Sequence, residues 1–535
     1  MQSEHEPGKT AAGPRRVGLL LVLTVAIPIL WARIGTLPLL DPDEAKHAEV
    51  AREMLAAGRW IEPVVYGQPY HHKPSLLYLL IGLCYRIVGV GELGARIVPA
   101  TAGLMAVLVT YLAASRRRVA DGLLASLLLL SAPLFFAVAR FTNFDGLLTL
   151  VSFAAILTAA RWIEDPEGPA APRRLIAFAV LAGLGVLVKG PAAAVLLMTP
   201  VAVLGFSALR ATGRRTLARA FAAFVAVVAI WMTPAGILYP TYLYDFLWVH
   251  NVERYSVNAD LFHPEPFWFF LPVLLATLLP WSLLVPHALV AAWRRSRGER
   301  LLVAYAVWVV LFFSISSGKL ATYVLPAYPV LAVLVAVWLG DETTRARPRR
   351  CSWLTRAVAL VYLLVPVAVY FVIRHEEPGF ESVAGSLVLL PLAGVAVLWP
   401  RADALRTEHG ATVVLAVAML ATYAVVLTWF SPVVGRFTSD RDLVATLARL
   451  GPPPDRVVVH KVRPFSFLFY SGWPIVYKVS DDEYRAALTA PGRVYVLTKP
   501  ARAATLVATD PPLVLREIAG THRRVVFERE NSRLP

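Results

Sequence analysis

Apolar runs of membrane-spanning length recur from residue 17 to residue 430 and restrict the folds open to this 535-residue chain. Hydrophobic residues make up 57% of the chain and charged residues only 16%. Because a lipid core offers the backbone no hydrogen bonds, such runs fold as transmembrane helices. The sequence therefore predicts a mainly α-helical, polytopic membrane protein. No small-residue cleavage site follows the first run, so we expect an uncleaved first span.

The distribution of arginines indicates the topology. Counting every apolar run gives fourteen candidate spans and places residues 116–118, three arginines, on the outside, against the positive-inside rule. If the 16-residue run 75–90 lies along the interface instead, thirteen spans remain and the arginine clusters fall in short inner loops. We therefore expect a cytoplasmic tail over 1–16 and a membrane domain over 17–430. The net charge of +16 then reflects topology rather than nucleic-acid binding.

A small domain is expected at the C-terminal end. From about Phe437 the hydropathy falls, and strand-like runs at 456–460, 493–498 and 523–528 alternate with helix-like runs. This alternation predicts an extracytoplasmic α/β domain over 437–535. The two cysteines of the chain lie far apart and give no disulfide framework.

The first outer loop, 38–93, begins with a dense cluster of ionisable side chains over 38–74. Charge beside lipid is costly, so such a cluster indicates function. Asp41 is expected to cap a helix, with Pro42 at its first position and Glu44 closing a capping box. Asp43 is not needed for the cap and is the best catalytic candidate. Lys46 follows it one turn later, so the helix presents an acid and a base on neighbouring faces.

Further cations fall on the predicted outer face. Each could be a snorkelling side chain at a helix end, but together they predict a pocket for a lipid phosphate or pyrophosphate. The set comprises Lys73, Arg140, Lys189, Arg254 and Lys319.

Four histidines, His71, His72, His250 and His263, are also expected outside, and two or three could join a carboxylate around zinc or magnesium. The alternative is ordinary hydrogen bonding at the interface. The sequence holds no phosphate-binding loop GxxxxGK(S/T), no GxSxG elbow and no HExxH pair. These absences argue against a nucleotide cofactor, a serine hydrolase and a zinc protease.

Seven segments, taken in order, resemble the aminoarabinose lipid A transferase family and its relatives, the protein O-mannosyltransferases. They read DPDEAKHAEVAREML, YHHKPSLLYLL, FTNFDG, KGP, HNVERY, HPEPFWFFLP and FFSISSGKLATYVLPAYP. The resemblance implies a C-type glycosyltransferase fold with thirteen transmembrane helices and a C-terminal α/β domain. It further implies an inverting enzyme that moves a sugar from polyprenyl (undecaprenyl) phosphate to a lipid A-type glycolipid or a protein, on the outer face of the bacterial inner membrane.

The resemblance also assigns residues. The acidic positions of the family fall on Asp43 and Asp145, which are expected to be catalytic. A Glu-Lys-Pro motif of the family reads His72, Lys73 and Pro74 here, so Lys73 carries over as a phosphate ligand while a histidine replaces the carboxylate. With His250, His72 keeps a metal site open. The other expected donor-binding positions are Lys46, which matches loosely, and Lys189, Arg254, Lys319 and Tyr323.

Two other classes of protein could also contain many membrane spans. A flippase or transporter of polyprenyl-phosphate sugars would also be polytopic, but transporters place ionisable groups near the bilayer midplane and often show inverted repeats. Here the ionisable residues favour one interface and no repeat is visible. A binding module with a membrane anchor would not require thirteen spans. The sequence specifies neither the sugar nor the acceptor.

Overall fold

The computed structural model describes residues 12–253, 265–316, 318–341, 408–430, 438–477, 481–503 and 514–529, and the single positions 357, 360, 364 and 435. The chain forms two compact units. The helical unit comprises Met1–Ile34, His71–Leu77 and Arg96–Thr428, and the mixed unit comprises Gly35–Tyr70, Tyr78–Ala95 and Trp429–Pro535. Most of the first outer loop, which the sequence assigns to the membrane domain, thus folds together with the C-terminal residues.

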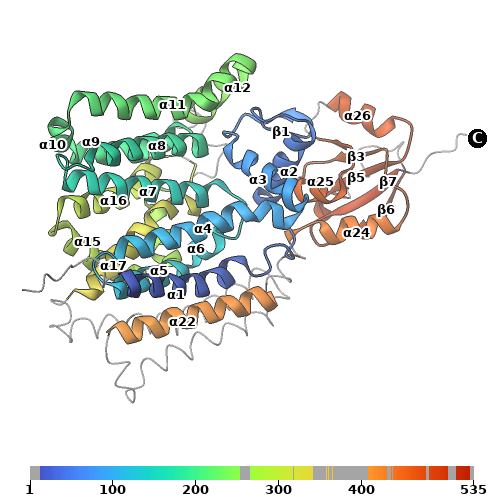
Figure 1. Ribbon diagram of the computed structural model, residues 1–535. Coiled ribbons are helices and arrows are strands. Elements are labelled where there is room, and N and C mark those ends of the chain that lie inside the picture. The colour runs from blue at the N-terminus through green and yellow to red at the C-terminus, as the bar shows by residue number, and fades with distance from the viewer. Residues whose placement is uncertain are drawn as a thin grey trace, which may run out of the picture. The chain divides into compact units, whose positions relative to one another are not determined.

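Long helices lie side by side in the helical unit (Figure 1). Its principal helices are α1 (Ala12–Trp31), α4 (Glu92–Ala114), α5 (Val119–Ser131), α6 (Pro133–Val138), α7 (Phe144–Glu164), α8 (Ala171–Lys189), α9 (Pro191–Leu204), α10 (Phe206–Ala211), α11 (Arg214–Leu238), α12 (Pro240–Tyr244), α14 (Phe270–Thr277), α15 (Val285–Trp293), α16 (Arg297–Ile315), α17 (Tyr328–Gly340) and α22 (Glu408–Val425). Short 3-10 segments η3 (Phe267–Phe269), η4 (Trp281–Leu283) and η5 (Ala321–Ala327), and π-helical segments η1 (Asp245–Glu253) and η8 (Val426–Phe430), connect or extend them.

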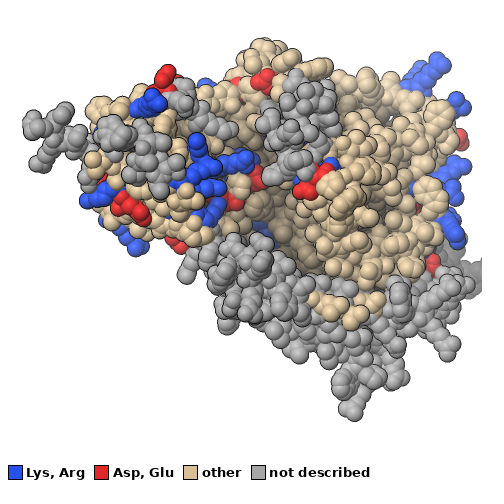
Figure 2. Space-filling model, turned by 180° about the vertical axis from the view of Figure 1, so that it is seen from behind, with Lys and Arg blue, Asp and Glu red and all other residues tan. Residues whose placement is uncertain are grey.

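Seven of the described helices are long and apolar enough to cross a membrane, and five shorter apolar helices accompany them. Figure 2 shows the corresponding broad surface of uncharged side chains. The prediction of a multi-pass helical membrane protein is therefore confirmed. The count of thirteen spans stays a prediction, because residues 365–407 lie outside the described part. The run 75–90 forms the 13-residue helix α3 (Leu76–Val88), which is too short to span a bilayer.

Small residues allow close helix packing next to the candidate site. Helix α8 lies against both α7 and α11. A Cβ atom built on Gly183 of α8 would lie 2.9 Å from Cβ of Val227 in α11, so only glycine fits at this contact. This packing fixes α8, at whose last residue Lys189 stands.

The mixed unit contains a five-stranded sheet of order β4-β3-β5-β7-β6. Strands β4 and β5 pair in parallel with β3, whereas β7 pairs antiparallel with β5 and β6. The elements are α24 (Arg441–Arg449), β3 (Arg456–Val459), α25 (Phe465–Ser471), β4 (Ile475–Val476), α26 (Asp481–Thr489), β5 (Val494–Thr498), β6 (Leu515–Gly520) and β7 (Val525–Arg529). The α/β character and the strands β3, β5 and β7 agree with the sequence prediction, while β4, β6 and α25 were not predicted.

Alternating side chains bury both faces of this sheet. Val457 and Val459 of β3 join α24 and α25 in one core, and Val458 joins α26 in the other. This period of two is what a strand between two layers requires. The unit is therefore a three-layer α/β/α arrangement.

The outer-loop part of the mixed unit contains α2 (Asp43–Ala56) and the hairpin β1 (Val64–Val65) and β2 (Gln68–Pro69). The carboxylate of Glu53 accepts from the backbone N–H groups of Tyr66 and Gly67, at 2.8 and 2.9 Å, and so fixes the hairpin turn against α2. Helix α2 ends just before Gly58, which has a positive φ of 63°.

Candidate active site

A buried ion pair joins the beginning of α7 to the end of α8. Lys189 Nζ donates to the carboxylate of Asp145, and each side chain is only 9% exposed. Asn143 caps α7, because its side-chain oxygen accepts from the N–H groups of Asp145 and Gly146 at 2.8 and 3.1 Å. The sequence FTNFDG thus places a carboxylate in the first turn of a helix, where the helix dipole favours negative charge.

The turn after Lys189 explains the KGP sequence. Gly190 has a φ of 84°, and Pro191 begins the next helix. A Cβ atom at position 190 would lie 2.6 Å from Cζ of Phe246, so the backbone passes too close for any larger residue. Lys189 Nζ lies 4.1 Å from the ring centroid of Tyr323, within cation–π range.

Two further lysines belong to this region of the helical unit. Lys73 Nζ lies 6.0 Å from the ring centroid of Phe144 and acts electrostatically on Asp145, while its backbone carbonyl accepts from Tyr242. Thr322 hydrogen-bonds the Asp145 carboxylate, and Lys319, three residues earlier in the chain, donates from Nζ to the Glu265 carbonyl at 2.7 Å.

We call Lys73, Asp145, Lys189 and Tyr323 the lysine cluster. Its two lysines outnumber its one carboxylate, and aromatic rings surround the cations. Positive charge in a poorly solvated, aromatic-lined setting suits an anion such as a phosphate. The structure thus brings together four of the predicted site residues.

Of the other predicted cations, Arg140 has hydrogen-bond partners of its own and Arg254 cannot be placed. Arg140 donates to the carbonyl of Ile29 at 2.8 Å and to that of Ala32, so it satisfies the end of α1 and is not part of the lysine cluster. Its place in the phosphate pocket stays a prediction. Arg254 lies outside the described residues.

The metal hypothesis is untested. His72 is exposed, and of His250, in η1, the structure describes the backbone but not the side chain. Among the side chains that the structure describes, no three His, Cys, Asp or Glu residues form a group that could hold a metal ion. The neighbouring His71 instead lies 2.7 Å from Asp245, measured from Nδ1 to Oδ2.

Asp43 and Lys46 form a second acid–base pair, in the mixed unit. Their carboxylate and ammonium are 2.6 Å apart, with the Asp43 side chain 50% exposed. Burial raises the pKa of Asp43, but the charge and hydrogen bond of Lys46 more than offset this, so the pKa lies below its usual value. Asp43 is thus an ionised, accessible carboxylate. His47 is instead buried, with Nδ1 3.1 Å from the hydroxyl of Tyr78.

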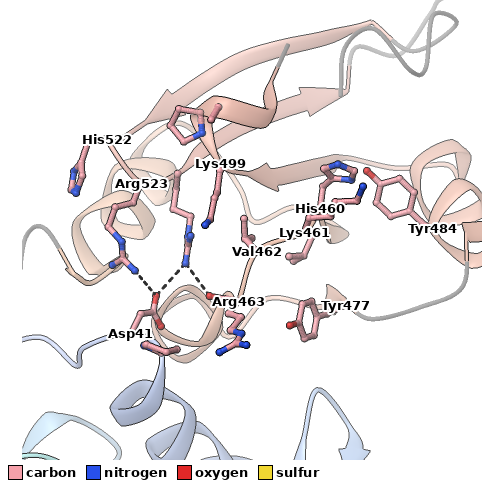
Figure 3. Close-up of a pocket in the computed structure, with 15 residues that line it drawn as sticks. Asp41, His460, Lys461, Val462, Arg463, Tyr477, Tyr484, Lys499, His522 and Arg523 are labelled. Carbon is pink, nitrogen blue, oxygen red and sulfur yellow. Dashed lines mark hydrogen bonds and ion pairs between the residues drawn. The ribbon is translucent and has the colours of Figure 1, made fainter. Parts of the chain in front are cut away.

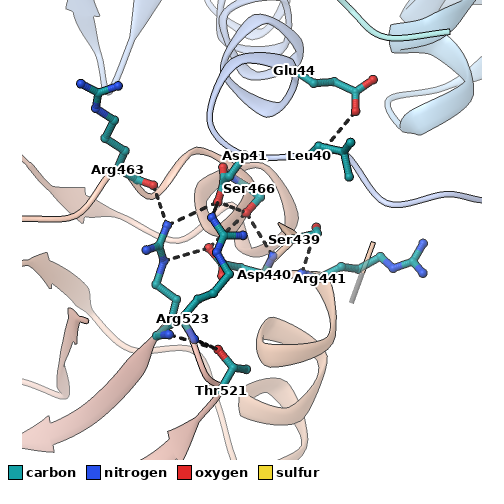
Figure 4. Close-up of polar contacts among 11 residues, drawn as sticks. Leu40, Asp41, Glu44, Ser439, Asp440, Arg441, Arg463, Ser466, Thr521 and Arg523 are labelled. Atoms are coloured by element: carbon teal, nitrogen blue, oxygen red, sulfur yellow. Dashed lines mark hydrogen bonds and ion pairs between the residues drawn. The ribbon is translucent and has the colours of Figure 1, made fainter. Parts of the chain in front are cut away.

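The predicted capping role of Asp41 is wrong. Helix α2 begins at Asp43 after Pro42, without a side-chain cap. The Asp41 carboxylate, at the edge of the cavity in Figure 3, accepts from the N–H and hydroxyl of Ser466 at 2.8 and 2.6 Å. Figure 4 shows Asp41 and Asp440 with Ser466 beside them, and Arg524 reaches both carboxylates at 3.4 Å. A tertiary network has replaced the local cap, and Glu44 accepts from the N–H of Leu40 instead of closing the box at Asp41.

This network predicts a pH dependence. Burial and the neighbouring Asp440 raise the pKa of Asp41 from 3.8 to about 7. The folded state therefore binds the proton more tightly than the unfolded state, and stability is lost as pH rises from about 4 to about 7. We expect protection of the Ser466 amide from hydrogen exchange, corrected for intrinsic rates, to fall across this window and to be flat in Asp41→Asn. If protection instead increases with pH, the neighbouring arginines lower the pKa of Asp41 more than burial raises it, and the expected pH dependence is wrong.

Sequence reasoning missed Thr322 and Asn143 as partners of Asp145, and Ser466, Asp440 and Arg524 as partners of Asp41. Asn143, two residues before Asp145 in FTNFDG, is a recognisable capping signal. The other partners are distant in sequence and carry no local signal.

Comparisons with known proteins place this chain in a family. A model of the dolichyl-phosphate-mannose-protein mannosyltransferase family matches residues 72–239. An undecaprenyl phosphate-alpha-4-amino-4-deoxy-L-arabinose arabinosyl transferase of Pectobacterium carotovorum is 32% identical over 374 residues, 66% of each chain. A Pseudomonas fluorescens transferase with the same description, numbered 1, is 31% identical over 414 residues, 73% of this chain and 71% of that protein.

The fold is similar to that of a solved structure. ArnT from Cupriavidus metallidurans bound to undecaprenyl phosphate superimposes with a TM-score of 0.81 and 24% identity over 96% of this chain and 98% of that one. The chain spans about two thirds of the length of the Pectobacterium relative, at 66%. The resemblance inferred from the motifs is confirmed. The chain belongs to the family of undecaprenyl phosphate-α-4-amino-4-deoxy-L-arabinose arabinosyl transferases.

Proposed function

We propose that this protein is an inverting glycosyltransferase that takes a sugar from undecaprenyl phosphate and transfers it to an acceptor. The observation that carries the proposal is the lysine cluster, in which Lys189 is held by Asp145 at the ends of two membrane helices. The names of the relatives, which specify undecaprenyl phosphate, agree with a site for a lipid-borne phosphate.

The leaving group explains why lysines are sufficient on the donor side. When the bond between the sugar and the phosphate breaks, negative charge develops on the phosphate oxygens. Lys73 and Lys189 would stabilise this charge, and the buried pair with Asp145 keeps Lys189 in a fixed position. A phosphate is a good leaving group, so no general acid is needed there.

Asp43 would act on the acceptor side. An acceptor hydroxyl needs a base, whereas an acceptor phosphate is already ionised, and the carboxylate would then orient it or stabilise positive charge on the sugar. The lowered pKa of Asp43 makes it a weak base at neutral pH. This favours the electrostatic role and hence a phosphate acceptor.

Relatives suggest the substrates. Their descriptions name 4-amino-4-deoxy-L-arabinose as the sugar. We propose the same sugar here, a glycolipid of the lipid A type as acceptor, and an active site on the outer, periplasmic face of the bacterial inner membrane. A protein acceptor is the alternative within the same chemistry.

Donor binding tests this proposal. Lys73→Ala removes one cation from the lysine cluster, so the affinity of the protein in lipid nanodiscs for undecaprenyl phosphate should fall about tenfold or more. Arg215→Ala is a matched control, because Arg215 is an exposed cation near the start of α11 and outside the cluster. Equal affinities in the wild type and Lys73→Ala would contradict the placement of the donor phosphate.

A separate measurement of bound metal tests whether His72 and His250 form a metal site. If His72 and His250 hold a divalent ion, purified protein retains about one zinc per chain and His72→Ala releases it. Carefully prepared wild type without metal would end that hypothesis and leave the proposed transfer unaffected, because no step above requires a metal.

A further inference from the structure

A second basic site lies in the mixed unit, around a cavity of about 1010 Å³ (Figure 3). The cavity is lined by the residues that directly follow β3, those that directly follow β5, and the turn between β6 and β7. Asp41 and Pro42 border it. Neither the sequence motifs nor the proposed donor site uses these residues, apart from the structural role of Asp41 and Arg524 in their ion-pair network.

The topology of the sheet indicates that ligands bind at the edge formed by the carboxyl ends of β3 and β5, where this cavity lies. From β3 the chain crosses through α25 to β4 on one side of β3, and from β4 it crosses through α26 to β5 on the other side. The two helices cover opposite faces of the sheet. The strand order therefore switches direction between β3 and β5. Ligands of open α/β sheets bind outside the carboxyl ends of the strands at such a point.

Charge is strongly unbalanced in this cavity. Five lysines and arginines line it, against Asp41 as the one carboxylate: Lys461, Arg463, Lys499, Arg523 and Arg524. Arg524 is buried and paired with Asp41 and Asp440. Lys461 and Lys499 are exposed, and neither ammonium has an acidic partner among the described residues.

Arg523 is the most informative of these side chains. Its Nη2 lies 4.0 Å from the Asp41 carboxylate, whereas its buried Nη1 has no hydrogen-bond partner in the described part of the chain. A buried guanidinium nitrogen without an acceptor costs free energy, and an anion that contacted the accessible part of this guanidinium from the cavity would stabilise its charge. Guanidinium and ammonium groups together are typical of phosphate recognition.

We propose that this cavity binds the phosphate monoester of a phosphorylated sugar, with Lys461, Lys499 and Arg523 as its ligands. The volume exceeds that of a phosphate alone and lies at the upper limit of the range for small-molecule sites. Tyr477 and Tyr484 also line the cavity and add aromatic surface, which suits the apolar part of a sugar. The site is separate from the lysine cluster, and its existence does not depend on the proposed transfer reaction.

The phosphate monoester could belong to a soluble phosphorylated sugar or to a lipid, and the experiment distinguishes the two. Full-length protein in phosphatidylcholine nanodiscs is titrated with glucose 1-phosphate, with glucose as the uncharged control. In a second arm, nanodiscs contain either phosphatidic acid, a lipid monoester, or phosphatidylglycerol, a diester. In both arms, mass spectrometry follows the acetylation rates of Lys461 and Lys499, with Lys9 as an internal reference.

We expect glucose 1-phosphate to slow acetylation of Lys461 and Lys499 several-fold and to bind at least tenfold more weakly to Lys461→Ala/Lys499→Ala. The matched control Arg449→Ala removes an exposed cation of the same unit, at the end of α24, and should bind like the wild type. Both lysines are exposed, so the double variant should keep its melting temperature. Protection by phosphatidic acid but not phosphatidylglycerol or glucose 1-phosphate would identify a lipid-borne monoester.

Two results would overturn the proposal. One is no protection by any monoester in either arm. The other is binding that the double variant leaves unchanged, which would place the anion elsewhere. Because neither arm measures sugar transfer, failure here leaves the proposed function intact, and failure of transfer leaves this binding site intact.

Discussion

Lys189→Met should destabilise the protein by about 3–5 kcal/mol, because it leaves the Asp145 carboxylate buried without its cation. Asp145→Asn should destabilise the protein by a similar amount, because it leaves the Lys189 ammonium buried without its carboxylate. The double variant replaces the pair by neutral groups of similar volume and should recover most of the stability. Thermal unfolding in nanodiscs measures all three variants.

Donor binding should separate function from stability in the same variants. If Lys189 binds the donor phosphate, the double variant regains stability but still binds undecaprenyl phosphate at least tenfold more weakly than the wild type. Arg118→Met is the matched control: Arg118 also pairs with a buried carboxylate, that of Asp121, at 3.1 Å in the helical unit. The variant Arg118→Met should be less stable than the wild type but should bind undecaprenyl phosphate with the same affinity. Recovery of both properties in the double variant would make the Asp145–Lys189 pair purely structural.

Asp43→Asn should reduce the turnover number by about 10²- to 10⁴-fold if Asp43 is the base for a hydroxyl acceptor, and by less if the acceptor is a phosphate. The side chain is half exposed, so folding should be little affected. Asp442→Asn is the matched control, because Asp442 is also an exposed aspartate in the first turn of a helix of the mixed unit. It loses the same favourable helix-dipole interaction but should keep full turnover.

Comparing acceptors gives the sharper result. The lowered pKa of Asp43 leads us to expect the smaller loss with the natural acceptor and a larger loss with any hydroxyl acceptor that the enzyme uses. Equal losses with both acceptor classes would contradict the assignment of Asp43 to acceptor activation.

Local sequence signals predicted much of the fold. The membrane helices follow from hydropathy, which a lipid environment enforces residue by residue. Strands β3 and β5 were predicted because short valine-rich runs are distinctive, and both strands are buried on both faces of the sheet. Strand β6, LREIAG, is mostly half-buried or exposed and lacks that pattern, and β4 has only two residues, so pairing rather than composition creates both.

The sequence predicted the features of the candidate site that depend on neighbouring residues. It did not predict those that depend on contacts between distant segments. The sequence KGP places Lys189 at a helix end, and FTNFDG caps the helix that carries Asp145. The pairing of these two residues, 44 positions apart, follows only from helix packing. Asp41 shows the converse. Its DPDE context is typical of a cap, yet Ser466 and Arg524, more than 400 positions away, compete successfully for its carboxylate.

The basic cavity shows why a charge pattern needs topology before it becomes a site. Lys461, Lys499 and Arg523 occur in three unrelated segments and resemble ordinary surface cations in the sequence. The parallel pairing of β3 with β5, and the antiparallel β7 beside them, bring the three segments to one edge of the sheet.

The most direct test of the central claim is sugar transfer from radiolabelled undecaprenyl phosphate 4-amino-4-deoxy-L-arabinose by the purified protein in nanodiscs supplied with a lipid A-type acceptor. The account predicts that the wild type moves the label to the acceptor, that Lys73→Ala loses donor binding, and that Asp43→Asn binds the donor but turns it over slowly. Tight donor binding without release of sugar to any acceptor, unaffected by Asp43→Asn, would contradict it and favour a transporter.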